Sequence, residues 1–125
     1  MRLLLIATAV TEVGTGLALL VAPVITALLL LGAEISGAAI PIARVTAAAL
    51  LALGVACWFA RGDVQSRAAK GLVAAILVYD LGAVLVLAIA GVQLPTAGIL
   101  LWVAVALHSA MAVWCVAVLR RKAAQ

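Results

Sequence analysis

Three side chains that can bind and release a proton, Glu12, Asp80 and His108, lie inside long uncharged stretches of this sequence. Each stretch holds roughly 20 mostly apolar residues, the length of a helix that crosses the hydrocarbon core of a bilayer. At about 1.5 Å per helical residue, Glu12 and Asp80 lie roughly 15 Å, and His108 roughly 18 Å, from the basic residue at the end of each helix. All three are therefore expected near the membrane midplane, where an ionised side chain costs about 2.5 kcal/mol or more.

Polar residues at this depth normally face the interior of a helix bundle and find partners there. One interpretation is that Glu12, Asp80 and His108 form a proton relay or a site for a small cation. The alternative is that one carboxyl is protonated and hydrogen-bonds to His108 or to a threonine, which would only set the helix register. Three threonines lie one helical turn from Glu12 and extend its polar face: Thr8, Thr11 and Thr15. A metal or haem site is disfavoured because no spacing such as Glu-x-x-His is present, and the cofactor, if any, is unknown.

Arg44 is the fourth candidate for a ligand or proton-relay site, and four residues are secondary candidates: Glu34, Tyr79, Cys57 and Cys115. Tyr79 is the neighbour of one midplane acid. Arg44 lies roughly 25 Å from the basic end of its helix, where it is expected to anchor at the interface. It would otherwise reach a midplane acid, Glu34 or an anionic or carbonyl group of a ligand. Cys57 and Cys115 are expected to be buried, reduced thiols near the basic helix ends, with mutual contact or palmitoylation as alternatives.

The composition explains why these polar residues stand out. The chain has 125 residues, of which 70% are hydrophobic and 10% are charged. One soluble domain of this length has too little interior to bury so much apolar surface, so lipid is the expected solvent. The net charge of +4 comes from basic residues that flank apolar stretches, which favours lipid headgroups over nucleic acid as the partner.

The sequence predicts an all-α bundle of four transmembrane helices in one domain, residues 1–125. Pro23 ends the first apolar stretch, because proline lacks the backbone donor that a helix needs. The segment after Pro23 is too short to span and is expected to lie at the interface. The predicted ranges are 3–22, 39–60, 71–90 and 97–119 for the spanning helices and 24–31 for the interfacial segment.

The basic residues predict the orientation. With four crossings, nearly all of them fall on one side: Arg2, Arg61, Arg67, Lys70, Arg120, Arg121 and Lys122. The opposite side holds only Glu34 and Arg44. The positive-inside rule then places both termini and the central loop in the cytoplasm, with an inner (plasma) membrane as the location. Because Glu12 interrupts the first apolar stretch, that stretch is expected to be an uncleaved helix.

A shift of 68 positions aligns the first and third predicted helices. It matches Glu12 with Asp80 and Gly14 with Gly82. Such a match indicates two duplicated helical hairpins, arranged as parallel repeats about an axis along the membrane normal. Gly14, Gly54 and Gly82 are expected where helices approach closely.

Four stretches, 13–23, 31–34, 40–45 and 53–58, carry a resemblance to a family of small, uncharacterised bacterial four-helix integral membrane proteins. The chain is also distantly similar in size and topology to DoxX-like membrane proteins. The resemblance implies a four-helix membrane protein and no particular activity.

Three functions remain open from the sequence. The first is a non-enzymatic accessory subunit or homo-oligomeric membrane component. The second is a proton- or cation-coupled small transporter or channel that uses the midplane acids. The third is a lipid- or quinone-handling membrane protein that uses Arg44. No nucleotide-binding loop, nucleophile motif or zinc spacing indicates an enzyme.

Overall fold

A computed structural model describes residues 1–123 as an all-α bundle, with no strand in that range. Four of its helices are long and apolar enough to cross a membrane, so the chain has the build of a multi-pass membrane protein. The predicted fold class is confirmed. The helices are α1 (Arg2–Val21), α2 (Pro23–Leu31), α3 (Ala39–Ala60), α4 (Arg67–Gln93) and α5 (Leu101–Ala123).

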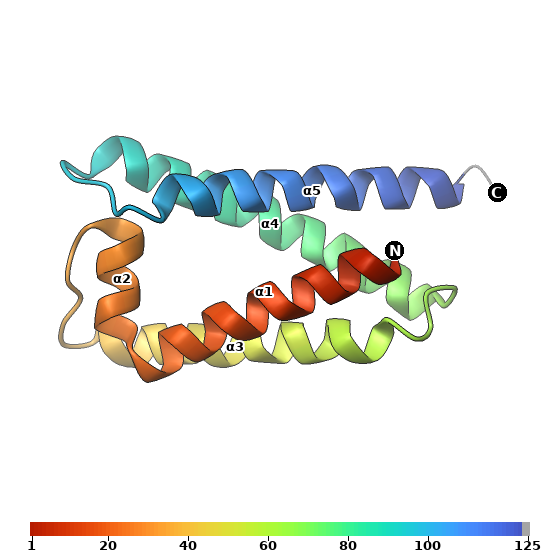
Figure 1. The fold of residues 1–125 in the computed structure, drawn as a ribbon, viewed down its shortest axis with the longest axis horizontal. Helices are drawn as coiled ribbons and strands as arrows, with labels where there is room; N and C mark the ends of the chain where they lie inside the picture. Colours follow the sequence, from red (N-terminus) through yellow and green to blue (C-terminus); the bar gives the residue numbers. More distant parts are fainter. Residues whose placement is uncertain (124–125) are drawn as a thin grey trace.

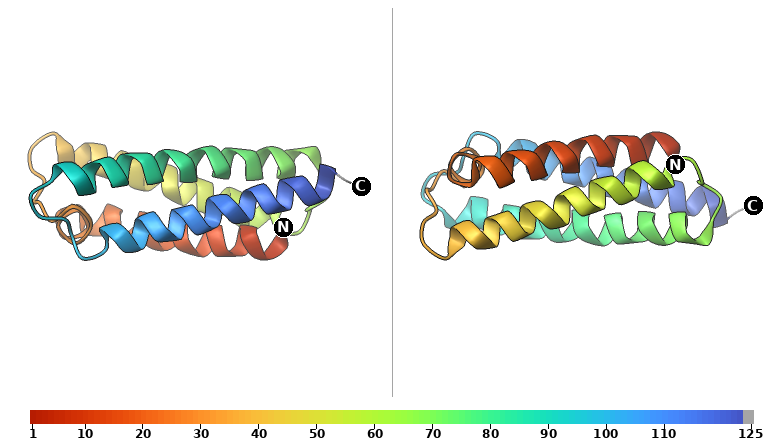
Figure 2. Two further views of the ribbon diagram at one scale, coloured as in Figure 1. Left: turned by 90° about the horizontal axis from the view of Figure 1, so that it is seen from above. Right: turned by 90° about the horizontal axis from the view of Figure 1, so that it is seen from below.

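The four long helices form two hairpins (Figures 1 and 2). Helix α1 packs along α3, and α4 packs along α5, whereas contact between the two hairpins is sparser. The short helix α2 lies across one end of the bundle, between α1 and α3 on one side and α5 on the other. The 68-residue shift relates α1 of one hairpin to α4 of the other in sequence, and the duplication of the whole hairpin stays a prediction.

The start of α1 and the end of α5 lie at the end of the bundle opposite α2 (Figure 1). The connection between α3 and α4, residues 61–66, lies at the same end. Basic residues therefore gather there, at the start of α1, the end of α3, the start of α4 and the end of α5. This end is called the basic end below.

Two helices begin four residues away from their predicted starts. Helix α4 begins at Arg67 rather than 71, because the Ser66 side chain accepts a hydrogen bond from the Ala69 backbone and caps a helix that includes the basic residues. It runs on to Gln93. Helix α5 begins at Leu101 rather than 97, because the preceding turn is used for docking on α2: the Leu100 backbone N–H donates to Leu29 at 3.0 Å.

Glycine allows α2 to pack against that turn. Gly32 ends α2 in the left-handed conformation, with φ of +71°, which glycine adopts without strain. A Cβ atom on Gly32 would overlap the Thr96 carbonyl, and one on Gly98 would overlap Leu29. Pro23 begins α2 where its missing N–H costs nothing, so the chain turns between α1 and α2 instead of continuing straight.

Glycines also set the distance between α1 and α3, although not all those expected. A Cβ on Gly54 would lie 2.7 Å from Val13 Cγ2, and one on Gly16 would lie 3.0 Å from the Ala47 carbonyl oxygen. Gly14 and Gly82 have no such neighbour within 4 Å, so the expectation that they lie at close approaches was wrong. Apolar residues surround the helices on every side, and the sequence therefore does not show which glycine faces the partner.

Candidate functional site

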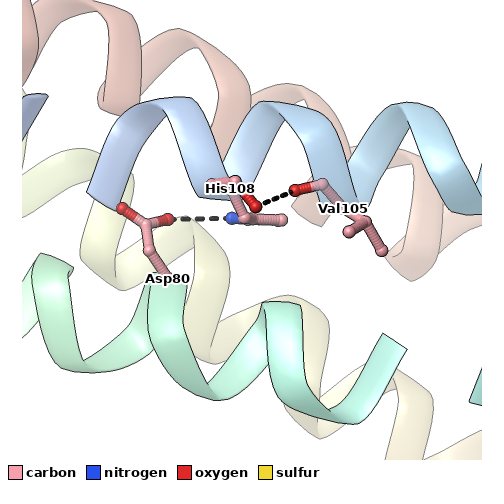
Figure 3. Close-up of polar contacts among 4 residues, drawn as sticks. Asp80, Val105 and His108 are labelled. Atoms are coloured by element: carbon pink, nitrogen blue, oxygen red, sulfur yellow. Dashed lines mark hydrogen bonds and ion pairs between the residues drawn. The ribbon is translucent and has the colours of Figure 1, made fainter. Parts of the chain in front are cut away.

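The polar centre of the bundle is a contact between Asp80 of α4 and His108 of α5 (Figure 3). The Nδ1 atom of His108 lies 2.8 Å from Oδ1 of Asp80, and the two side chains are 13% and 2% exposed. The same turn of α5 has a second polar group, Ser109, but its hydroxyl donates to the Val105 carbonyl at 2.7 Å. Ser109 is therefore satisfied within its own helix, and His108 is the group that α5 offers to α4.

Glu12 of α1 joins this pair from the other hairpin. Its carboxyl lies near the Tyr79 hydroxyl and interacts electrostatically with His108 and Asp80. The Tyr79 ring meets the His108 ring edge to face, with centroids 5.5 Å apart and planes at 82°. Tyr79 therefore lies near both Glu12 and His108, and the three midplane residues converge in one bundle.

Two buried oxygen atoms in this region have no hydrogen-bonding partner among the described residues: Thr8 Oγ1 and Asp80 Oδ2. Thr8 is 1% exposed and lies one turn before Glu12, which is 3% exposed. Thr15, expected on the same polar face, is exposed instead. The cluster thus retains unused hydrogen-bonding capacity, which is costly for buried polar groups and common at sites that exchange a proton or a ligand.

The register of the helices explains why these residues meet. Glu12 follows Arg2 by ten residues and Asp80 follows Lys70 by ten, while His108 precedes Arg120 by twelve. Because all these helix ends lie at the basic end, equal spacing along the helices means equal depth in the bundle. The depth was readable from the sequence. The position of Tyr79 near both Glu12 and His108 was not, because it depends on how α4 is rotated about its axis.

The side chains of the cluster are of types that can exchange protons. No group of three His, Cys, Asp or Glu side chains in the described part of the chain is arranged to hold a metal ion. Two carboxyls, an imidazole and a phenol lie near one another here, and groups of these kinds can pass protons along hydrogen bonds.

Arg44 and Glu34 do not take part in this cluster. Both are exposed near the α2 end, Arg44 on α3 and Glu34 in the connection that precedes it. Neither forms an ion pair or hydrogen bond with another residue in the range 1–123. The alternatives in which Arg44 reaches Glu12 or Glu34 were wrong, since the side chain leaves the bundle. The interfacial anchor remains the expected role of Arg44.

Cys57 of α3 and Cys115 of α5 belong to one hydrophobic core near the basic end, and neither is exposed. Leu4, Val73 and Ile76 pack in the same core. Both thiols are free, and their complete burial leaves no route for a palmitoyl group in this conformation. The two cysteines therefore help to join the hairpins as apolar side chains.

Comparison of the chain with protein-family models, curated proteins and solved structures finds no match. The resemblances stated from the sequence remain predictions.

Proposed function

We propose that this protein is a membrane component that binds and releases protons at Glu12, Asp80 and His108, and that it couples this exchange to the transport of a small cation. The observation that supports the proposal is the convergence of these three side chains from three helices and both hairpins. A residue pair that only sets register needs one hydrogen bond. Glu12 is a third ionisable group, and Asp80 Oδ2 has no hydrogen-bonding partner among the described residues. Neither is needed to set the register.

Charge balance explains how protons and a cation would be coupled. Two carboxylates and a neutral imidazole carry two negative charges, so two protons make the cluster neutral. Each proton added or lost leaves one net charge in hydrocarbon, which costs about 2.5 kcal/mol or more. A cation that enters as a proton leaves avoids this cost. The cluster is thus suited to exchange one for the other.

The proposed orientation has the basic end in the cytoplasm and the α2 end outside, in an inner (plasma) membrane. The positive-inside rule supports it, since the basic residues of α1, α3, α4 and α5 gather at one end. Cysteines introduced at Ser36 and at Asp63 test it in whole cells. A membrane-impermeant thiol reagent is expected to label the first and not the second, and the reverse pattern overturns the orientation.

Proteoliposomes test the transport. With a pH-sensitive dye inside, an imposed pH gradient and the potential clamped by valinomycin and potassium, the parent protein is expected to dissipate the gradient faster than empty vesicles. Glu12→Gln and Asp80→Asn are expected to abolish the difference. Glu34→Gln is the matched control, because Glu34 is an exposed carboxyl in a loop. No flux in the parent, or equal flux in Glu12→Gln and Glu34→Gln, would overturn the proposal.

The accompanying cation is identified in the same assay. Replacement of sodium by a large organic cation, with potassium and valinomycin kept to fix the membrane potential, is expected to slow proton release. An unchanged rate would show that sodium does not accompany the protons. Helix content and gel-filtration profile of each variant confirm that it is folded.

A second candidate, an accessory subunit or homo-oligomer, is supported by α4. Only 17% of its most apolar stretch is buried within this chain, so most of its surface is left for lipid or another protein. The mass of the detergent-solubilised particle distinguishes these cases, and a stable monomer that co-purifies with no other chain would remove this candidate.

A further inference from the structure

An apolar groove of about 490 Å³ runs along the outer face of the α1–α3 hairpin. Val10 and Gly14 line one side of it, and Val55, Trp58 and Phe59 line the other. Val10 is 64% and Phe59 78% exposed, so the groove opens away from the bundle interior. In a membrane it therefore faces the acyl chains of the surrounding lipid.

The groove exists because of glycine. A Cβ atom on Gly14 would meet no other atom within 4 Å, so the absent side chain leaves open space on the helix surface. Gly54, which also lines the groove, brings the two backbones close enough to form a narrow floor. The groove is therefore apolar and bounded by larger side chains, a shape that can hold a flexible hydrocarbon chain.

A cation is held beside the basic end of the groove. The guanidinium of Arg61 lies over the Trp58 ring, 3.6 Å from its centroid, and donates a hydrogen bond to the Trp58 backbone carbonyl. These two contacts fix the charge next to a residue that lines the groove. Arg2, at the start of α1, lies at the same end of the hairpin.

The groove lies in the half of the bilayer next to the basic end. Its lining residues, 9–14 on α1 and 54–59 on α3, span roughly 8 Å of helix, and Gly14 lies roughly 18 Å from Arg2, near the middle of a hydrocarbon layer of about 30 Å. A phospholipid with its phosphate beside Arg61 would therefore lay an acyl chain along Trp58, Val55 and Gly14 towards the midplane.

We propose that this groove is a binding site for an anionic phospholipid of the leaflet at the basic end, with the acyl chain between α1 and α3 and the phosphate at Arg61. Arg61 provides the headgroup preference, and the space at Gly14 admits the chain. The groove shares no lining residue with the Glu12, Asp80 and His108 cluster. The proposed lipid site is therefore independent of the proposed transport.

Quenching of Trp58 fluorescence tests the headgroup preference. Trp102→Phe with Trp114→Phe leaves Trp58 as the single tryptophan. This variant is reconstituted in two sets of phosphatidylcholine vesicles. One set contains brominated phosphatidylglycerol, and the other contains the same fraction of brominated phosphatidylcholine. The anionic lipid is expected to quench with a relative binding constant about fivefold higher, the effect of one cation near a membrane surface. Equal quenching by the two lipids would overturn the proposal.

Two matched pairs of variants separate the groove from general attraction to the basic end. Arg61→Gln is expected to abolish the preference, and Arg67→Gln, which removes an exposed cation at the same end, is expected to keep it. A comparison of quenched with unquenched intensity within each variant corrects for the lost Arg61–Trp58 contact. Equal loss in both variants would show that only the summed charge matters, which contradicts the site.

Gly14→Leu fills the groove and is expected to reduce quenching by both brominated lipids. Gly82→Leu is the control, because Gly82 is also free of neighbours within 4 Å and lies on α4 outside the groove. Neither new Cβ atom meets another residue within 4 Å, so both proteins are expected to fold, as helix content and gel filtration will show. Unchanged quenching in folded Gly14→Leu would overturn the proposed position of the chain.

Discussion

Asp80 and His108, 28 residues apart in the sequence, place Oδ1 and Nδ1 2.8 Å apart across the α4–α5 hairpin. Glu12 comes to this pair from the α1–α3 hairpin, with Tyr79 between them. The polar cluster therefore crosses the interface between the hairpins and lies next to the apolar core formed around Cys57 and Cys115. A change in the protonation of the cluster would act directly on how the two hairpins pack.

A double-mutant cycle measures the Asp80–His108 contact. Asp80→Asn and His108→Gln are each expected to destabilise the bundle, and their coupling energy is expected to be about 1 kcal/mol, because the hydrogen bond exists only when both groups are present. Tryptophan fluorescence during titration with a denaturing detergent reports the unfolding. Strictly additive effects would show that the two residues contribute separately.

Tyr79 has two contacts that substitutions can separate. Tyr79→Phe keeps the ring against His108 and loses the hydroxyl that lies near Glu12, so a loss of about 1 kcal/mol in unfolding free energy is expected if the two groups hydrogen-bond in the membrane. Tyr79→Leu also removes the edge-to-face contact and is expected to cost about 1 kcal/mol more. If Tyr79→Phe is as stable as the parent protein in the same titration, the hydroxyl does not stabilise Glu12.

Gly54 is expected to tolerate no side chain. Gly54→Leu would force apart Ala9 and Val13 of α1 and should lower the unfolding free energy by about 1–3 kcal/mol, the usual cost of overpacking. Gly82→Leu adds the same side chain where no atom lies within 4 Å, so little change is expected. Similar stability of the two variants would contradict the close approach of α1 and α3.

Alanine substitutions at Gly32 and Gly37 distinguish the cost of backbone strain from the cost of steric overlap by the new Cβ atom. Both have positive φ, of 71° and 56°, so alanine at either position should cost about 1 kcal/mol. Only at Gly32 would the new Cβ also overlap the carbonyl of Thr96, so Gly32→Ala is expected to undock α2. Hydrogen exchange of the Leu100 amide, which donates to Leu29, should accelerate in Gly32→Ala and not in Gly37→Ala.

Cys57 and Cys115 are expected to be protected from a small maleimide. Both thiols are fully buried, so they react only when the core opens, and an opening free energy of about 3 kcal/mol slows labelling about 100-fold. A cysteine introduced at the exposed loop position Asp63 gives the unprotected rate in the same detergent. Equal rates at all three positions would show that the core around the thiols is open.

The sequence alone determined the number of long apolar helices and the depth of their polar residues. Uncharged stretches long enough to span, bounded by basic clusters, predict four crossings, and the constant rise of an α-helix then places Glu12, Asp80 and His108 at one depth. Only the tertiary structure decided which way each residue faces. It brought Tyr79 between Glu12 and His108, put Gly16 rather than Gly14 against α3, and turned Arg44 out of the bundle. The physical reason is that lipid is as apolar as the helix interface, so no alternation of polar and apolar residues marks the buried side, and the rotation of each helix depends on packing with its neighbours.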